Sequence, residues 1–550
     1  MLRALPKTAS RSYQSISILF VPATVTAAVS LSLVVGAAGC GPPTLRLDAS
    51  QQPSVDGDDG HDEPDCVDGQ KRCYDGRHQE CRQAQYQDIE SCGSRACLPD
   101  LGCVDCNPAY ETICTDDELH ECNADGTVGE VLEICNPGMC YNGECHDPCA
   151  DAVERRSYIG CEYWPVDLDN AIDIAESCSS DTISVRLKAC VPFVGNPILL
   201  CEFDDSCPTG YTCKETDICV REAQHSPFAV VVSNPDQTSS VEVTLSNMAG
   251  LSKTVTVAAG EVKALLPQSM GFSDQSLDYS GITDKAYRLT SARPIVAYQF
   301  NPLDNVGVFS NDASLLLPTH TFDREYLVLG WPTEGPKFRG YATIVASDPG
   351  TTKITVTPTA NVYAGPGFSA MTAKIGKSFE LRQFQTLTLQ AQPGGDLSGT
   401  VITGDKPFGA FSGHEAVAIV ETTAVCCADH LEDQLFPTST WGKVFALARS
   451  QQRKSEPDRI RVIAQKPGTA VTVNGSSAEC KTLERGTACA FNIKGDVEIR
   501  ATEPILVAHY LLSIGSGDDN SGDPALSFAV PTEQFRTSYT FLVPDKYKSN

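Results

Sequence analysis

The chain has 550 residues, which is enough for several domains, and 25 of them are cysteines. Its 70 Asp and Glu residues outnumber its 42 Lys and Arg residues, giving a formal net charge of −28. Phosphate binding needs clustered positive charge, so this balance argues against a nucleic-acid partner and is typical of a soluble surface.

The N-terminus carries a targeting signal. Arg3, Lys7 and Arg11 precede the uncharged run ISILFVPATVTAAVSLSLVVGAAGC, which ends in small residues at position 40. A basic start, an apolar middle and a small-residue end predict a secretory signal peptide over 1–39.

The end of this run resembles a bacterial lipobox. The letters AAGC predict cleavage before Cys40 and a lipid on that cysteine, which would hold the chain on a membrane. Gly41 after the cysteine favours the outer membrane and the cell surface. Ala37 stands where a lipobox usually has leucine, so cleavage after Ala37 or Ala38, or an uncut membrane anchor, are the alternatives.

The remaining 24 cysteines predict a disulfide-bonded, exported protein. The acidic residues 40–65 predict a disordered tether. Residues 66–149 hold two copies of a six-cysteine repeat, at 66, 73, 81, 92, 97, 103 and at 106, 114, 122, 135, 140, 145. Units this small need cross-links for stability. Zinc on CVDC (103–106) is the alternative, although a matching second pair is missing.

A β-rich region follows over 150–550. Stretches such as FAVVVSNP, VEVTLSN, KITVTPT and TLTLQAQ alternate β-branched and polar residues between turn residues, which predicts strands. Eight more cysteines run from Cys149 to Cys219, and we expect a small stapled module over 172–226 inserted into this region. No long helical periodicity is visible.

The β region repeats internally. An apolar strand after proline recurs at 291–302, 404–415 and 501–512, and each copy precedes a Pro-Thr pair at Pro318, Pro437 and Pro531. About 100 residues with six or seven strands suit one β-sandwich per unit, so we predict an all-β fold of tandem β-sandwich-like units. A β-propeller-like ring is the alternative. The last repeat is incomplete at Asn550.

Several ordered stretches resemble the N-terminal domain of the IgGFc-binding protein family. They are LSGTVITGDKPFGAFSGHE, CCADHLEDQLFPTSTWG, CEYWPVDLDN, FAVVVSNP, RPIVAYQFN and ATIVASDPG, and together they cover roughly 155–550. The resemblance implies an extracellular, non-catalytic module for binding or adhesion. It does not cover 1–150, and it identifies no residue that would contact an immunoglobulin.

Residues 409–442 contain the strongest chemical candidates. His414 and Glu415 lie upstream of Cys426, Cys427, Asp429 and His430. These residues could form a metal site, a nucleophile with its base, or a structural staple. Exported thiols face oxidation, and the sequence HEAVA lacks the second histidine of a zinc-protease helix, so a staple is favoured.

The family resemblance bears on the pairing of these cysteines. In the family, a cysteine after SGH can pair with the one before DH, and Glu415-Ala416 replaces the first of them here. Cys427 therefore needs another partner, and a Cys426–Cys427 disulfide is the first hypothesis. Cross-pairing with Cys480 and Cys489 is the alternative, although those two are well spaced to close their own loop.

Three weaker candidates have simpler explanations. Asp518, Asn520 and Asp523 could bind calcium, but they lack a full calcium loop, and an acidic turn is favoured. The basic run at 449–461 could receive an acidic glycan or be a solvated loop. Tyr163 and Trp164 are expected in the core rather than on a sugar.

We therefore predict a cell-envelope-anchored protein that binds an extracellular protein or glycan, with no cofactor and no catalysis. A secreted hydrolase with a metal or thiol site near 414–430 is one alternative. A structural envelope or matrix component is the other.

Overall fold

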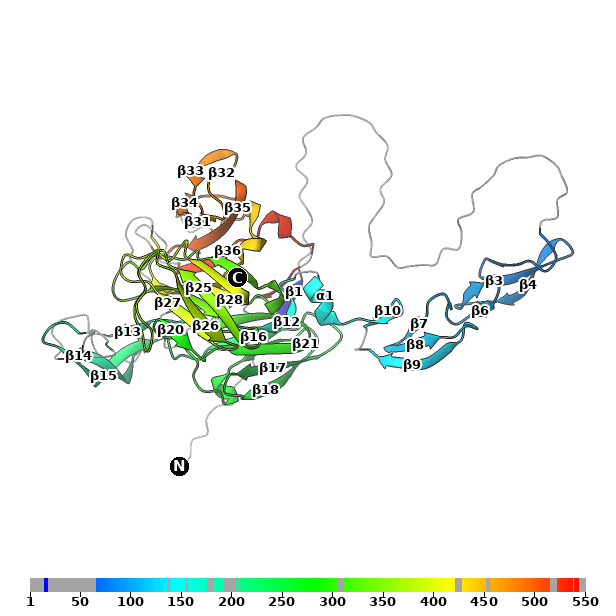
Figure 1. The fold of residues 1–550 in the computed structure, drawn as a ribbon, viewed down its shortest axis with the longest axis horizontal. Coiled ribbons are helices and arrows are strands. Elements are labelled where there is room, and N and C mark those ends of the chain that lie inside the picture. Colours follow the sequence, from blue (N-terminus) through cyan, green and yellow to red (C-terminus); the bar gives the residue numbers. More distant parts are fainter. Residues whose placement is uncertain are drawn as a thin grey trace, which may run out of the picture. The chain divides into compact units, whose positions relative to one another are not determined.

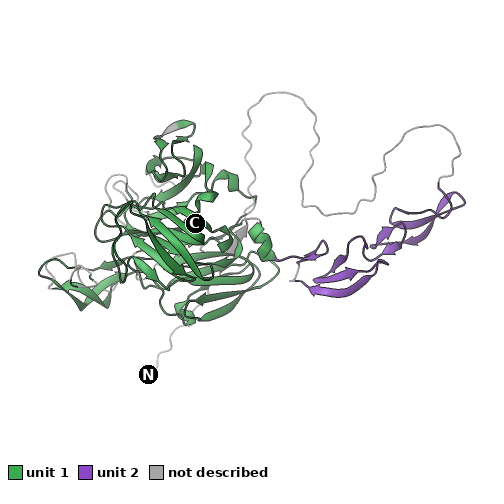
Figure 2. Ribbon diagram, viewed as in Figure 1, with its two compact units in different colours: residues 1–18, 148–550 green, residues 19–147 purple. Residues whose placement is uncertain are grey.

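A computed structural model describes residues 14–17 and 66–543, apart from gaps at 136–138, 155–156, 176–177, 179–181, 192–200, 202–203, 205–206, 304–307, 309, 421–427, 452–455, 515–521 and 538. The chain is mostly β, with 52% strand and 5% helix, as predicted. It divides into two compact units, residues 1–18 with 148–550 and residues 19–147 (Figure 2).

In the unit over residues 19–147, the described part (residues 66–147, apart from 136–138) holds the two cysteine-rich repeats. Each repeat has a three-stranded antiparallel sheet and a two-stranded hairpin. In the first repeat these are β2 (Lys71–Tyr74), β3 (Arg77–Arg82), β4 (Gln85–Ser91), β5 (Ala96–Leu98) and β6 (Gly102–Val104). In the second they are β7 (Thr112–Thr115), β8 (Glu118–Cys122), β9 (Val128–Ile134), β10 (Cys140–Tyr141) and β11 (Glu144–Cys145).

The two repeats share one disulfide connectivity, which the sequence did not reveal. In each, the first cysteine pairs with the third, the second with the fifth and the fourth with the sixth. The pairs are Cys66–Cys81, Cys73–Cys97, Cys92–Cys103, Cys106–Cys122, Cys114–Cys140 and Cys135–Cys145. The two cysteines of CVDC are thus in different disulfides, which leaves no thiolate there for zinc.

The other unit contains three β-sandwiches in tandem, built around three long strands: β21 (Tyr287–Asn301), β28 (Val401–Val417) and β35 (Val497–Leu511). The first part of each long strand lies between two strands of one sheet, and the second part lies between two strands of another. One strand therefore joins both sheets, which makes each sandwich nearly closed (Figure 1). This is the predicted tandem arrangement rather than a ring of blades.

Seven strands correspond in the three sandwiches, and the second sandwich has an eighth, β20, which pairs with β27. The first sandwich has β12 (Gly160–Tyr163), β16 (Ala229–Ser233), β17 (Val241–Asn247), β18 (Ser252–Val257), β19 (Val262–Leu265), β21 and β22 (Asp312–Leu315). The second has β20 (Gly281–Thr283), β23 (Asp323–Leu327), β24 (Gly340–Val345), β25 (Thr351–Thr357), β26 (Lys377–Arg382), β27 (Thr386–Gln390), β28 and β29 (Asp429–Gln434). The third has β30 (Gly442–Leu447), β31 (Asp458–Ala464), β32 (Thr469–Val473), β33 (Ser476–Leu483), β34 (Ala488–Ile493), β35 and β36 (Ala525–Phe528).

The Pro-Thr pairs lie where the chain passes from one copy of the sandwich repeat to the next. Pro318, Pro437 and Pro531 each adopt an extended conformation and begin a single 3-10 turn: η3 (Thr319–Thr321), η4 (Thr438–Thr440) and η5 (Thr532–Gln534). Proline suits this position because its fixed φ matches the turn and its missing N–H is not needed there. After the turns η3, η4 and η5 the chain enters β23, β30 and β37 (Thr540–Val543), respectively, each of which begins a new copy of the repeat.

Close packing against the repeated proline fixes glycine at the start of β12 and of β30. A Cβ at Gly160 would lie 2.4 Å from Pro318 Cβ, and one at Gly442 would lie 2.2 Å from Pro531 Cβ. Both distances are far below van der Waals contact, so the repeated proline packs where a side chain is absent.

The cysteine-rich insertion forms its own small sheet between β12 and β16. Its strands are β13 (Ile172–Ile174), β14 (Ile183–Val191) and β15 (Thr212–Glu222), with a small core of Ala189, Ile218 and Val220. Its disulfides are Cys178–Cys219, Cys190–Cys207 and Cys201–Cys213. Before it, Cys149 in helix α1 (Pro148–Glu154) pairs with Cys161 in β12.

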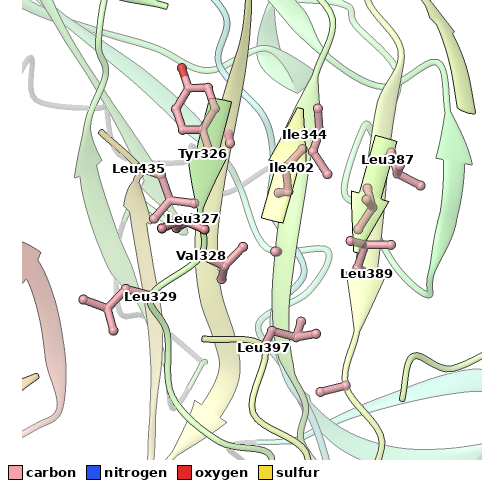
Figure 3. Packing of buried hydrophobic residues seen from close by; sticks show 14 of the residues in the cluster. Tyr326, Leu327, Val328, Leu329, Ile344, Leu387, Leu389, Leu397, Ile402 and Leu435 are labelled. Carbon is pink, nitrogen blue, oxygen red and sulfur yellow. The ribbon is translucent and has the colours of Figure 1, made fainter. Parts of the chain in front are cut away.

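Each sandwich has a buried apolar core. Figure 3 shows the packing in the second sandwich, where Leu327, Ile344, Leu389 and Ile402 come from different strands of the two sheets. This core continues into the third sandwich through residues that include Tyr510, so the two sandwiches share an apolar interface. Burying one such aliphatic side chain stabilises the fold by about 1.5–3 kcal/mol.

Little of the predicted signal peptide can be described. Within it, the structure describes β1 (Gln14–Ser17), which pairs antiparallel with β37. Cys40 and the tether lie outside the described residues. In the part of the chain that is described, none of the helices combines the length and apolar character needed to span a bilayer. The signal peptide and the lipid therefore stay predictions.

Candidate functional site

The histidines of the predicted site lie on neighbouring strands of the second sandwich. His414 is in β28 and His430 is in β29, and the register of these strands places His414 opposite Leu431. Both side chains are buried, with His414 1% exposed and His430 fully covered. Cys426 and Cys427 lie outside the described residues, so their pairing stays a hypothesis.

Burial makes both histidines neutral. It lowers the pKa of His414 and of His430 to about 3, because a charged imidazole loses its hydration in the core. His430 Nδ1 lies 3.4 Å from the carbonyl oxygen of Glu415, and its Nε2 lies 3.4 Å from Glu432 Oε2. Neither histidine is placed to meet a substrate from solvent.

Glu415 belongs to a buried polar cluster beside the histidines. Its carboxylate accepts hydrogen bonds from the Arg339 backbone N–H (3.1 Å) and from Gln390 Nε2 (3.0 Å). Gln390 Nε2 also donates to Asp169. Burial raises the pKa of Glu415 to about 8, against the opposing effect of Arg339. Burial likewise raises the pKa of Asp169 well above its usual range and that of Asp278 to about 6.

A second row of acids joins the edge strands β22 and β29. Glu432 N donates to Asp312 Oδ2 at 3.0 Å, and Asn311 N donates to Asp429 Oδ1 at 2.8 Å. Gln434 N donates to Ser314 Oγ at 3.0 Å. These side chains satisfy backbone groups that edge strands would otherwise leave unpaired.

Asp433 extends this row to the third sandwich. It accepts hydrogen bonds from Phe528 N in β36 at 2.8 Å and from Ser314 Oγ in β22 at 3.1 Å. Burial raises the pKa of Asp433 and of Asp429 to about 7, and it raises the pKa of Asp312 and Glu432 well above their usual range. We name Asp312, Asp429, Glu432 and Asp433 the acid seam, which connects edge strands of all three sandwiches.

The described cysteines of the β region are in disulfides. Cys480 in β33 is bonded to Cys489 in β34 across nine positions of sequence. Within the described residues, the one group of His, Cys, Asp or Glu side chains with metal-ligand spacing is Cys190, Cys201 and Cys207, and all three are disulfide-bonded. Their sulfurs are therefore not available as thiolates.

The other sequence candidates also have structural roles where they are described. Tyr163 and Trp164 are buried in the first sandwich, as predicted. Arg461, from the basic run, is buried and donates to Gly330 O and, at 2.6 Å, to Asp396 Oδ2, which ties the third sandwich to the second. Asp523 is exposed, while Asp518 and Asn520 lie outside the described residues.

The sequence analysis missed a groove of about 190 Å³ in the third sandwich. It is lined by Ala446, Leu447, Ala448, His509, Ser527, Ala529, Val530 and Phe535. His509 Nε2 lies 2.9 Å from Asp458 Oδ2, and Phe535 is 54% exposed at the mouth. His509 lies in the repeated apolar strand ATEPILVAHYLL, where a polar residue in an apolar run was the available signal.

Comparison with known families gives one match. Residues 312–550 match the family described as IgGFc binding protein. The match begins at the first residue of β22 and covers less than half of the chain and less than the predicted 155–550. No curated protein matches the chain.

The matched family is a binding domain and not a known enzyme family, which suggests an extracellular binding protein. The many disulfides agree with export. All strands of the first sandwich except β22 lie before the match, yet its seven strands pair in the same order as their counterparts in the other two sandwiches.

Proposed function

We propose that this chain is a cell-envelope-anchored protein that binds an extracellular protein or glycan through its β-sandwiches, without catalysis. The match of residues 312–550 to a binding family carries the proposal. Immunoglobulin itself is not part of it, because no residue has been assigned to that contact.

The burial of the candidate site supports binding over catalysis. His414, His430 and Glu432 lie inside the sandwich, and His430 contacts the Glu415 carbonyl oxygen and the Glu432 carboxyl group. A hydrolase would need a nucleophile and a base that substrate can reach. The hydrolase alternative therefore depends on Cys426 and Cys427.

Anchoring is the second part of the proposal. The lipid on Cys40 would hold the chain at the outer membrane, and the tether with the two cysteine-rich repeats would carry the sandwiches away from the surface. Labelling of intact cells that express a tagged chain tests this part. Absence of labelling on residues 66–550 would contradict surface display.

The groove beside His509 is the first surface to test for the ligand. Grooves with an apolar lining and a few polar groups are the usual form of a binding site. The purified, disulfide-bonded chain should be applied to an array of extracellular proteins and acidic and neutral glycans. The proposal expects saturable binding to one of them that chelators and thiol-blocking reagents leave intact.

A pair of variants locates the binding surface. Phe535→Asp places a charge at the mouth of the groove, and Ile375→Asp is the control because Ile375 is 62% exposed on the second sandwich. Weaker binding in Phe535→Asp alone would assign the groove. No saturable binding by the unmodified chain, or turnover that chelation or thiol blocking abolishes, would overturn the proposed function.

A further inference from the structure

The second cysteine-rich repeat exposes an apolar edge strand. The order of its sheet is β7-β8-β9, so among the described residues β9 (Val128–Ile134) has one neighbouring strand and one free backbone edge. Its register places Val128, Val131 and Ile134 opposite Cys122, His120 and Glu118 of β8. The three β8 residues are two positions apart and therefore share one face of the sheet. The three apolar residues of β9 are three positions apart, and two register shifts bring them all onto that same face.

These side chains are in contact with solvent. Val128 is 37% exposed, Val131 46%, Leu132 55% and Ile134 74%. Natural edge strands are usually protected by charges, proline or covering segments, because a free apolar edge pairs with other chains. The charges in β9 are Glu130 and Glu133, and they leave four exposed apolar side chains on the strand, which is typical of an interaction site.

The net charge of this repeat indicates the charge that a partner must have. Residues 106–147 contain ten Asp or Glu residues and no Lys or Arg, whereas residues 66–105 contain seven acids and five Lys or Arg. Two of the acids, Glu130 and Glu133, are exposed in β9 itself. A partner that pairs with this edge therefore needs positive charge.

The first repeat provides an internal comparison with the same disulfide connectivity. Its edge strand β4 has two apolar residues, Tyr86 and Ile89, among polar ones, and its acids are paired: Asp88 with Arg77, and Glu90 with Arg95. The exposed apolar residues and the excess of acidic charge at β9 therefore do not follow from the disulfide framework. β4 occupies the same position in the first repeat, yet it has fewer apolar residues and its acids are paired with arginines.

We propose that β9 accepts an extended strand of a partner protein in which apolar residues alternate with Lys or Arg. The backbone edge would supply hydrogen bonds, the apolar face would receive alternate side chains, and the acids would select the basic ones. This site is separate from the ligand surface of the β-sandwiches and does not depend on it.

Fluorescence anisotropy with a defined probe tests the proposal. The probe is a labelled eight-residue peptide that alternates lysine and valine, added to the full disulfide-bonded chain. The test variant is Val131→Lys with Ile134→Lys, which places charges on the edge. The control is Gln87→Lys with Ile89→Lys, which adds the same charges to β4. Unchanged disulfide mapping shows that both variants fold.

The proposal expects binding that weakens at least about tenfold in the β9 variant and changes little in the β4 variant. A peptide of the same sequence with alternate backbone nitrogens methylated should also bind at least about tenfold more weakly, because it cannot complete the strand ladder. Equal binding of the methylated peptide would mean attraction by acidic charge alone and would overturn the proposal.

Two further outcomes contradict the proposed partner. If sedimentation shows a dimer of the unmodified chain that the β9 variant abolishes, the edge pairs with a second copy instead. If the alternating peptide does not bind at low ionic strength, where attraction between opposite charges is strongest, the edge is not an acceptor for basic strands.

Discussion

The buried acids make stability depend on pH in an unusual direction. Burial raises the folded-state pKa of Glu415 to about 8 and that of Asp429 and Asp433 to about 7, whereas unfolded carboxyl groups titrate near pH 4. Between these values the folded chain holds protons that the unfolded chain has released. The contribution of these three groups to the free energy of unfolding is therefore greatest below about pH 4 and falls as pH rises towards 8.

The slope of this dependence follows from proton linkage. Each extra proton on the folded state lowers the free energy of unfolding by about 1.4 kcal/mol per pH unit. Glu415, Asp429 and Asp433, protonated in the folded state, together contribute a fall of about 4 kcal/mol per pH unit between pH 5 and 6.5. Asp169, Asp312 and Glu432, whose pKa burial also raises, add to this fall. His414 and His430 oppose it, because they are neutral in the folded state and take up protons in the unfolded chain below about pH 6.5. Urea unfolding at a series of fixed pH values, followed by tryptophan fluorescence, measures the slope.

Two variants isolate the contribution of one carboxyl group. Asp433→Asn cannot titrate, so we expect the fall of the free energy of unfolding between pH 5 and 6.5 to become shallower by about 1.4 kcal/mol per pH unit. Glu498→Gln is the control, because Glu498 is exposed and a hydrogen bond from Arg500 lowers its pKa, out of this window. A free energy of unfolding that rises with pH between 5 and 6.5, or an unchanged slope in Asp433→Asn, would refute the reasoning.

Three further changes test packing and cross-links by urea unfolding. Leu389→Ala removes a fully buried side chain and should cost about 2–5 kcal/mol, whereas exposed Ile375→Ala should cost little. Replacing Cys480 and Cys489 by alanine should cost about 2–3 kcal/mol, because the bridge closes a short loop; no change would mean that the bond is not formed. Arg461→Met should cost about 1–3 kcal/mol, since Asp396 is 32% exposed and can rehydrate; a loss above about 5 kcal/mol would contradict that compensation.

The sequence predicted much of the fold because its signals were local. Alternation of β-branched and polar residues identified strands, and the recurring Pro318, Pro437 and Pro531 identified the units. The cysteine count identified the stapled modules and the insertion. These patterns depend on neighbours in the chain, so they can be read without coordinates.

What the sequence did not reveal depends on contacts between distant residues. Nothing local shows that β28 joins two sheets, or that Asp433 reaches Phe528 in another sandwich. The disulfide connectivity could not be deduced from the sequence for the same reason. The sequence offered His414 and His430 as possible metal ligands or bases, and only packing showed that they are buried and neutral.

A thiol and metal count on the exported, folded chain, with non-reducing peptide mapping of residues 414–442, tests the central claim most directly. The account predicts no free thiol, no stoichiometric metal and a Cys426–Cys427 link, which would make this segment a staple in a binding protein. A bound metal or a reactive thiolate at Cys427 would contradict it and favour the hydrolase.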